Sequence, residues 1–161
     1  MEEVKILPIK LEYSGVNIII GQAHFIKTVE DLYEALVSAG EIRFGISFNE
    51  ASGDRLIRSD GNDEKAIEIS KEIAKKIGAG HIFVIVLSKG YPINVMKKIK
   101  EVDEVVNIYV ATANPLTVIV GEYEGNRGIL GIIDGSSPLG FEDEVKKKER
   151  HDFLRKIGYK K

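Results

Sequence analysis

A chain of 161 residues, 43% apolar and 30% charged, has the size and composition of one folded domain with a substantial core. Its 23 basic and 25 acidic residues give a formal net charge of −2, which argues against nucleic acid as the main partner. No apolar run is long enough to cross a membrane and the N-terminus has no signal-peptide pattern, so we expect a cytoplasmic protein that does not bind membranes.

The first half of the chain predicts three strands and two helices. Apolar runs and alternation predict the strands, at Val4–Leu7, Val16–Ile20 and Ile42–Phe48. Apolar residues at helical spacing predict helices over Thr28–Ala39 and Asp63–Ile77. Thr28 and Asn62 are the expected N-caps of these helices. The expected inner face of the second helix is Ala66, Ser70, Ile73, Ala74 and Ile77.

The second half predicts a central strand at Ile82–Leu87, because its apolar run is continuous. Further strands are expected at Val105–Val110, Leu116–Val120 and Gly128–Asp134, with a short helix at Ile93–Ile99. The charge run Glu142–Asp152 predicts a terminal helix that lies on the surface or against a neighbouring subunit. This order of elements is typical of the α/β (α+β) class, as a single domain with one mixed β-sheet and helices packed on it.

The connection Gly21–Thr28 joins a predicted strand to a predicted helix and contains His24, Lys27 and Thr28. Backbone N–H groups at a helix start favour an anion, and phosphate commonly binds there. A histidine beside such a site could bind a phosphoryl group, accept one, or move a proton. The alternative is that His24 caps a loop or packs against the sheet.

A second polar stretch, Asn49–Asp63, follows a predicted strand. Arg55 and Arg58 could clamp a phosphate. A carboxylate of this stretch could hold a ribose hydroxyl or Mg²⁺. The alternative is a solvated surface loop. The residues that we count as candidate substrate or phosphate contacts here are Asn49, Glu50, Ser52, Arg55 and Arg58, and the candidate carboxylates are Glu50, Asp54 and Asp60.

Two later residues are also candidates. Asn114, at the turn before Pro115, could bind a base or shape the turn. Asp134 ends the last strand before Gly-Ser-Ser, which is equally typical of a metal or phosphate corner and of a simple turn. We interpret His81, at the start of the central strand, as a structural residue.

The common chemical motifs are absent from the sequence. It has no P-loop, no Rossmann fingerprint, no protein-kinase signature and no nucleophile elbow. With no cysteine and three scattered histidines, we predict no zinc site, and we name no residue as an assigned metal ligand. The abundance of Lys, Glu and Ile, with a single Gln, fits a heat-adapted protein.

Several long blocks closely resemble the adenosine-specific kinase family of archaea and bacteria, over nearly the whole chain. The blocks are GQAHFIKTVEDLYEALV (21–37), FGISFNEASGDRLIRSDGND (44–63), AGHIFVIVL (79–87), YPINV (91–95), ATANP (111–115) and GILGIIDGSSPLG (128–140).

The resemblance implies binding of adenosine or AMP, a histidine that carries a phosphoryl group, and assembly as a homo-oligomer, a trimer. We transfer the phosphorylatable role to His24, because it alone lies in a connection suited to an anion, and His81 is the alternative. In the enzyme hypothesis, Arg55 or Arg58 neutralises charge, and Mg²⁺ is a candidate cofactor held by Asp54 or Asp134. The sequence indicates no phosphate donor. In a second hypothesis the pocket senses adenosine or AMP without turnover, and in a third the chain is an oligomeric structural protein.

Overall fold

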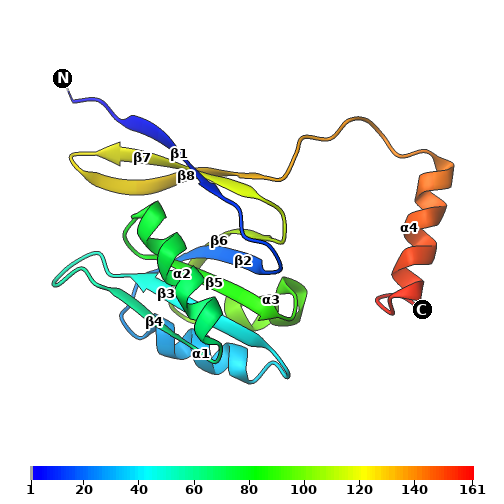
Figure 1. The fold of residues 1–161 in the computed structure, drawn as a ribbon, viewed down its shortest axis with the longest axis horizontal. Coiled ribbons are helices and arrows are strands. Elements are labelled where there is room, and N and C mark those ends of the chain that lie inside the picture. The colour runs from blue at the N-terminus through cyan, green and yellow to red at the C-terminus, as the bar shows by residue number, and fades with distance from the viewer. Residues whose placement is uncertain (1) are drawn as a thin grey trace.

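The computed structural model describes residues 2–161, with eight strands and four helices in this range (Figure 1). The strands are β1 (Lys5–Leu11), β2 (Asn17–Ala23), β3 (Arg43–Asn49), β4 (Ile57–Gly61), β5 (Ile82–Lys89), β6 (Val105–Thr112), β7 (Leu116–Tyr123) and β8 (Asn126–Asp134). The helices are α1 (Thr28–Val37), α2 (Glu64–Ile77), α3 (Pro92–Lys100) and α4 (Glu144–Lys156). None of these helices has the length and apolar character needed to cross a lipid bilayer.

The α+β class is confirmed, but the strands form two sheets instead of one. One sheet has three strands in the order β1-β7-β8, and the other has five in the order β4-β3-β5-β2-β6. All neighbouring strands in residues 2–161 pair antiparallel, so neither sheet is mixed. The chain passes from the larger sheet to the smaller at Asn114-Pro115, which makes that segment a connection between sheets and not a hairpin.

The central position of β5 is confirmed, and its side chains divide the core into two parts. Ile82, Val84 and Val86 face one side, which α2 and the three-stranded sheet cover. Phe83, Ile85 and Leu87 alternate with them and face the side that α1 and α3 cover. Successive side chains of a strand point to opposite faces. Both faces of β5 are buried, and this explains why its sequence is apolar at every position from Ile82 to Leu87.

Helix α2 has the inner face predicted from the sequence. Its buried residues are Ala66, Ser70, Ile73, Ala74 and Ile77. The helix packs closely on β3 at Gly45, where an added Cβ would come within 2.2 Å of the backbone nitrogen of Ile67. Gly78 ends the helix in the left-handed conformation (φ 65°).

Several predicted boundaries are wrong for local reasons. Pro8 lies inside β1 instead of ending it, and this is tolerated because β1 is an edge strand. Thr28 is the first residue of α1, and Lys27 precedes the helix without a side-chain cap. Asp63 precedes α2, also without a side-chain cap. Asn62 instead accepts a hydrogen bond from the N–H of Phe44 and donates one to the carbonyl oxygen of Ile42.

The C-terminal part of the chain extends away from the body. After β8 an extended segment leads to α4, which stands apart from the sheets in Figure 1. Asp143 caps α4, because its side chain accepts a hydrogen bond from the N–H of Lys146. No residue of α4 is buried. The prediction of a terminal helix in this region is confirmed.

Candidate functional site

Three loops meet at one end of the five-stranded sheet, where β2 and β3 end and β5 begins. The N–H of Ala23, the last residue of β2, donates to the carbonyl oxygen of His81 (2.9 Å). The N–H of His81 donates in turn to the carbonyl oxygen of Asn49 (2.8 Å), the last residue of β3. These bonds join the loop that begins at His24 to the loop that begins at Glu50. The two polar stretches predicted from the sequence therefore lie at the same end of the sheet.

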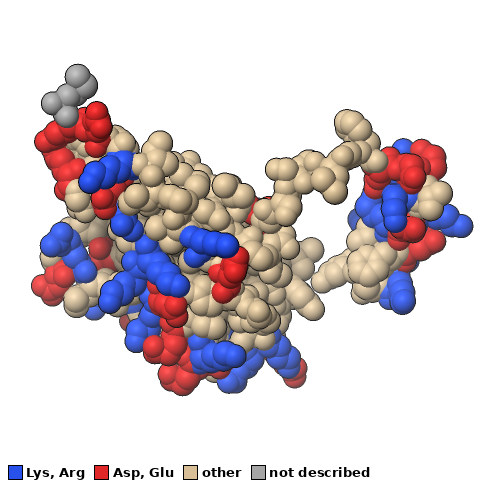
Figure 2. All heavy atoms as spheres, turned by 45° about the horizontal axis from the view of Figure 1, so that its top comes forward, with Lys and Arg blue, Asp and Glu red and all other residues tan. Residues whose placement is uncertain are grey.

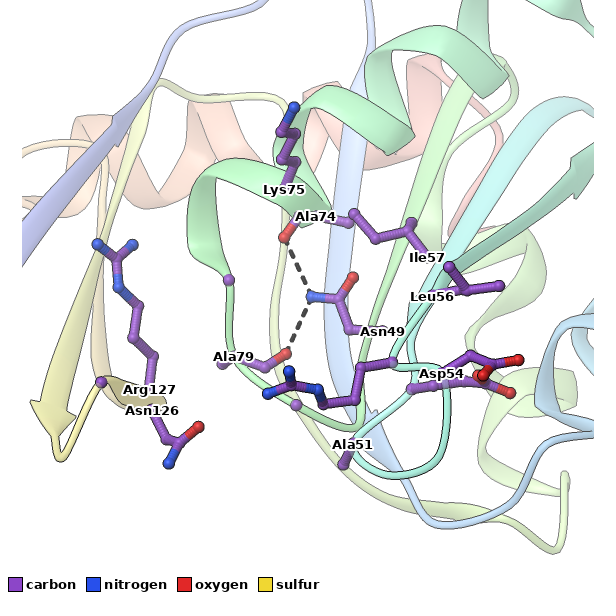
Figure 3. Close-up of a pocket in the computed structure, with 15 residues that line it drawn as sticks. Asn49, Ala51, Asp54, Leu56, Ile57, Ala74, Lys75, Ala79, Asn126 and Arg127 are labelled. Carbon is purple, nitrogen blue, oxygen red and sulfur yellow. Dashed lines mark hydrogen bonds between the residues drawn. The ribbon is translucent and has the colours of Figure 1, made fainter.

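A cavity of about 570 Å³ opens at this end, between the loop after β3, the end of α2 and the tip of the β7–β8 hairpin (Figure 3). Its volume is in the range of small-molecule sites, about 300–1,000 Å³. The lining includes three predicted site residues, Asn49, Glu50 and Arg55, and also Asp54. A ligand in this cavity would contact both sheets.

Asn49 is buried at the edge of the cavity, with 6% of its surface exposed. Its amide nitrogen donates to the carbonyl oxygens of Ala74 (3.0 Å) and Ala79 (2.9 Å), the dashed lines in Figure 3. Within residues 2–161, no group donates a hydrogen bond to its amide oxygen, Oδ1. Because a buried polar atom without a partner is costly, a ligand N–H or O–H group that reached Oδ1 would make a favourable hydrogen bond.

The arginines of the site differ in how their charges are neutralised. Both Nε and Nη2 of Arg58 contact Oε1 of Glu50 (2.9 and 2.8 Å), so this pair is internally balanced. Arg127 contacts Oε1 of Glu122 (3.0 Å) and donates to carbonyl oxygens at the end of α2, which ties the hairpin to the helix. Arg55 is exposed and forms no ion pair within residues 2–161. Arg55 is therefore the cavity arginine that is best able to bind an anion.

His24 is exposed in the loop between β2 and α1. Lys27, in the same loop, forms ion pairs with Asp31 and with the buried Glu104. The hydrogen bonds to Asp31 and Glu104 raise the pKa of the Lys27 ammonium, and the bond from Lys27 lowers the pKa of the Asp31 carboxyl. Ala23, at the end of β2, pairs with Val105, at the start of β6. His24 follows Ala23 and Glu104 precedes Val105, so both residues lie next to this pair. Two carboxylates therefore hold the Lys27 charge within the loop that contains His24.

Other predicted residues of this end have structural surroundings. Thr28 is fully buried and its hydroxyl donates to the carbonyl oxygen of Phe25, which shapes the loop and leaves no hydroxyl at the surface. Ser52 is exposed, and its carbonyl oxygen accepts from the N–H of Arg55 (3.2 Å). The His81 ring stacks on Phe48 with centroids 5.8 Å apart, which agrees with the structural interpretation of His81.

Asn114 and Asp134 lie together at the opposite end of the molecule. Asn114 Nδ2 donates to Asp134 Oδ1 (3.4 Å), and the N–H of Gly135 donates to the carbonyl oxygen of Pro115. This end holds a second cavity of about 930 Å³, lined by Asn17, Ser88, Tyr91 and others. The structure therefore separates Asn114 and Asp134 from the other predicted site residues.

The larger cavity is the weaker candidate site. None of its lining residues has a buried polar side-chain atom that lacks a partner, among the residues described. The smaller cavity has one, Asn49 Oδ1, and also adjoins the His24 loop.

Within residues 2–161, no group of three His, Cys, Asp or Glu side chains lies close enough together to hold a metal ion. Of the two alternative Mg²⁺ ligands, Asp54 lines the smaller cavity and Asp134 lies at the opposite end. We derive no chemical step through Mg²⁺.

Sequence reasoning missed three residues of this end. Glu104 follows a loop and looks like one more surface carboxylate, yet it is 2% exposed and its Oε2 has no partner within the described range. Lys75 and Arg127 line the cavity from α2 and β8. The sequence EYEGNR (122–127) is typical of a turn, and nothing in it indicates that Arg127 would contact the end of α2.

Three comparisons with known proteins bear on this site. A family model described as adenosine specific kinase matches residues 8–160. The crystal structure of PH1918 protein from Pyrococcus horikoshii OT3 is similar at 45% sequence identity, with a TM-score of 0.94 over 99% of each chain. A search of curated proteins found no match.

Proposed function

This chain belongs to the adenosine-specific kinase family, and on that premise we propose that it binds adenosine or AMP in the Asn49 cavity and transfers a phosphoryl group through His24. The observation that carries the proposal is Asn49, a buried residue that lines a ligand-sized cavity beside the His24 loop and whose Oδ1 has no partner within residues 2–161. Adenine carries an amino group, the kind of donor that an Asn oxygen accepts.

The charged residues of the cavity suit the rest of a nucleotide. Asp54 lines the cavity and can accept hydrogen bonds from ribose hydroxyls, as carboxylates do in dinucleotide sites. Arg55 lines it as well, and its guanidinium can bind a phosphate with two parallel hydrogen bonds. Adenosine and AMP would thus share the base and ribose contacts, and AMP would gain the contact with Arg55.

The proposed transfer has two steps. In the first, an imidazole nitrogen of His24 attacks the phosphorus of a phosphoanhydride donor, and the P–N bond forms as the bond to the leaving oxygen breaks. In the second, a hydroxyl oxygen of adenosine attacks that phosphorus, the P–N bond breaks, and the hydroxyl proton passes to a carboxylate such as Asp54. Positive charge from Arg55 and Lys27 offsets the charge on the phosphoryl oxygens, which is the main catalytic requirement of such reactions.

Binding is tested by calorimetric titration with adenosine, AMP and ATP, with and without Mg²⁺. We expect saturable heat with adenosine and AMP. Arg55→Ala should weaken AMP binding by about tenfold or more and change adenosine binding little, because only AMP presents a phosphate. Arg43→Ala, which removes an exposed arginine at the other end of β3, is the matched control. Equal loss of affinity for both ligands in Arg55→Ala would contradict the assigned orientation.

The transfer step is tested with His24→Ala. We expect this variant to lose turnover and acid-labile phosphate while it still binds adenosine, because His24 lies outside the cavity lining. His151→Ala removes an exposed histidine on α4 and is the matched control. Turnover that persists in His24→Ala would exclude His24 as the phosphoryl carrier.

A second candidate function is a sensor that binds adenosine or AMP without turnover. It is favoured by the carboxylates that occupy the Lys27 ammonium, because this lysine must exchange partners before it can contact a phosphate. The sensor predicts saturable binding with no turnover in the unaltered protein, with any donor and with Mg²⁺ present.

A further inference from the structure

The last part of the chain, residues 136–161, forms what we call the C-terminal arm. Beyond Gly135, which bonds to Pro115, every hydrogen bond of the arm within the described residues is made inside the arm. Leu139 and Phe141 have relative exposures of 105% each, as in an unfolded chain. In Figure 2 the arm stands off from the body, and near its end Tyr159 borders the larger cavity. Apart from Tyr159, the arm therefore gains little stabilisation from its own body.

Such an arm does not hold its shape through local interactions alone. Its helix α4 has 13 residues, and isolated helices of about 12–15 residues are marginal in water. The arm also exposes apolar side chains that would be stabilised by burial. These side chains are Leu139, Phe141, Val145, Phe153 and Ile157.

The arm has the same place in a protein whose structure was determined in a crystal. The likeness to PH1918 extends over 99% of each chain with a TM-score of 0.94. A differently placed arm would lower this score by roughly its share of the chain, so the two arms extend alike. Something outside the single chain must therefore stabilise this position.

The body carries an apolar face without a cover, on the outside of the three-stranded sheet. Ile6 pairs with Gly121, and an added Cβ on Gly121 would meet Val4 and Leu130 at 3.3 and 3.2 Å, so these residues share one face. Val4, Ile6 and Leu130 are 57%, 66% and 60% exposed. Figure 2 shows few charged groups over this side of the body. We call it the outer sheet face.

We propose that the arm of each copy lies on the outer sheet face of a second copy of this chain. The arm and the face have the same apolar character, and every copy brings one of each. The arm leaves its own body after β8 (Figure 1), so its own sheet is left for a neighbour's arm. Exchange of an identical segment between protomers is a common route to oligomers. Here the exchange would bring the arm of one copy against the outer sheet face of the other. This contact does not depend on the proposed activity.

Cysteine cross-linking tests the contact, because the natural chain has no cysteine. The double variant Phe141→Cys/Leu130→Cys is expected to form covalent multimers on mild oxidation, and each single variant is the control for random pairing. Disulfides within one chain, or no more multimer than in the single variants, would overturn the proposal.

Sedimentation tests its consequence with the full chain. The unaltered protein should sediment as an oligomer, and Leu139→Asp/Phe141→Asp should reduce its mass toward the 17.9 kDa of one chain. Ile6→Asp, on the receiving face, should do the same, and circular dichroism checks that the body stays folded. Val37→Asp, 46% exposed on α1, is the matched control and should leave the mass unchanged. An unaltered protein that is monomeric, or arm variants that keep the oligomer mass, would overturn the exchange.

Discussion

Lys27 and its two carboxylates are the most closely coupled charges near the candidate site. Glu104 is buried just before β6, and its only ion-pair partner in residues 2–161 is Lys27. Asp31 shares the same ammonium from the first turn of α1. A buried carboxylate that loses its partner is strongly disfavoured, so this group links the His24 loop to the sheet as well as supplying charge.

Lys27→Ala is expected to lower the melting temperature, because it leaves the Glu104 carboxylate buried without a counter-charge. Replacing Glu104 as well, in Lys27→Ala/Glu104→Gln, should restore part of the loss, since a neutral amide is less costly to bury. Lys71→Ala removes an exposed pair with Glu68 and is the control, with little expected change. Thermal unfolding by circular dichroism compares them, and an equal effect in the Lys71 control would contradict this account.

Asp31 makes the stabilisation by the Lys27, Asp31 and Glu104 charges sensitive to acid. The hydrogen bond from Lys27 lowers the pKa of Asp31 in the folded protein. The resulting stabilisation is fully present above the ordinary aspartate pKa, about 3.9, and is lost as pH falls through the lowered folded value. Asp31→Asn should therefore be less stable than the unaltered protein at neutral pH, and the difference should shrink in strong acid.

Urea unfolding at several pH values between about 7 and 2 measures this difference. Asp103→Asn, which removes an exposed carboxylate of a nearby turn, is the control for general charge effects. A difference between Asp31→Asn and the unaltered protein that stays constant down to the lowest pH would contradict the linkage.

At the scale of elements, the closest contact is between α2 and β3. The absence of a side chain at Gly45 lets the backbone at Ala66 and Ile67 pack directly against the strand. This contact positions the end of α2 and hence Ala74, whose carbonyl oxygen holds the Asn49 amide. The packing of α2 on β3 thus helps to orient Asn49 at the edge of the cavity.

Gly45→Ala is expected to destabilise the protein by about 1–3 kcal/mol or more, because the new Cβ would lie 2.2–2.5 Å from backbone atoms of Ala66 and Ile67 that cannot move separately. Gly128→Ala adds a methyl group in β8 where no atom lies within 4 Å, and should change stability by less than about 0.5 kcal/mol. Chemical unfolding measures both variants. Similar stabilities would show that α2 can shift away from β3 without loss.

Most elements, but few of their ends, could be predicted from the sequence. The alternation in β3, the apolar run of β5 and the inner face of α2 follow from burial, which the spacing of apolar residues reports directly. The N-caps depend on local hydrogen bonds instead. Asn62 has a side chain suited to capping α2, but its amide oxygen accepts a hydrogen bond from Phe44 of β3 instead. The local sequence around Asn62 does not contain this competing partner.

At the scale of the whole molecule, the division of the strands into two sheets creates the candidate site. The cavity lies where the β7–β8 hairpin meets the end of α2 and the loop after β3. The sequence predicted both the polar stretch Asn49–Asp63 and the His24 loop, since each follows a strand and contains unusual polar residues. It could not show that Arg127 would reach this end, or that Asn114 and Asp134 would lie at the other, because both facts depend on how the sheets pack.

The most direct test of the central claim is a crystal structure of the protein with AMP. We predict that AMP occupies the Asn49 cavity, with a donor of the base within hydrogen-bond distance of Asn49 Oδ1 and the phosphate against Arg55, on the side of the His24 loop. AMP bound in the other cavity, near Asn17 and Ser88, would contradict the proposed site, and so would an empty Asn49 cavity in crystals grown at saturating AMP.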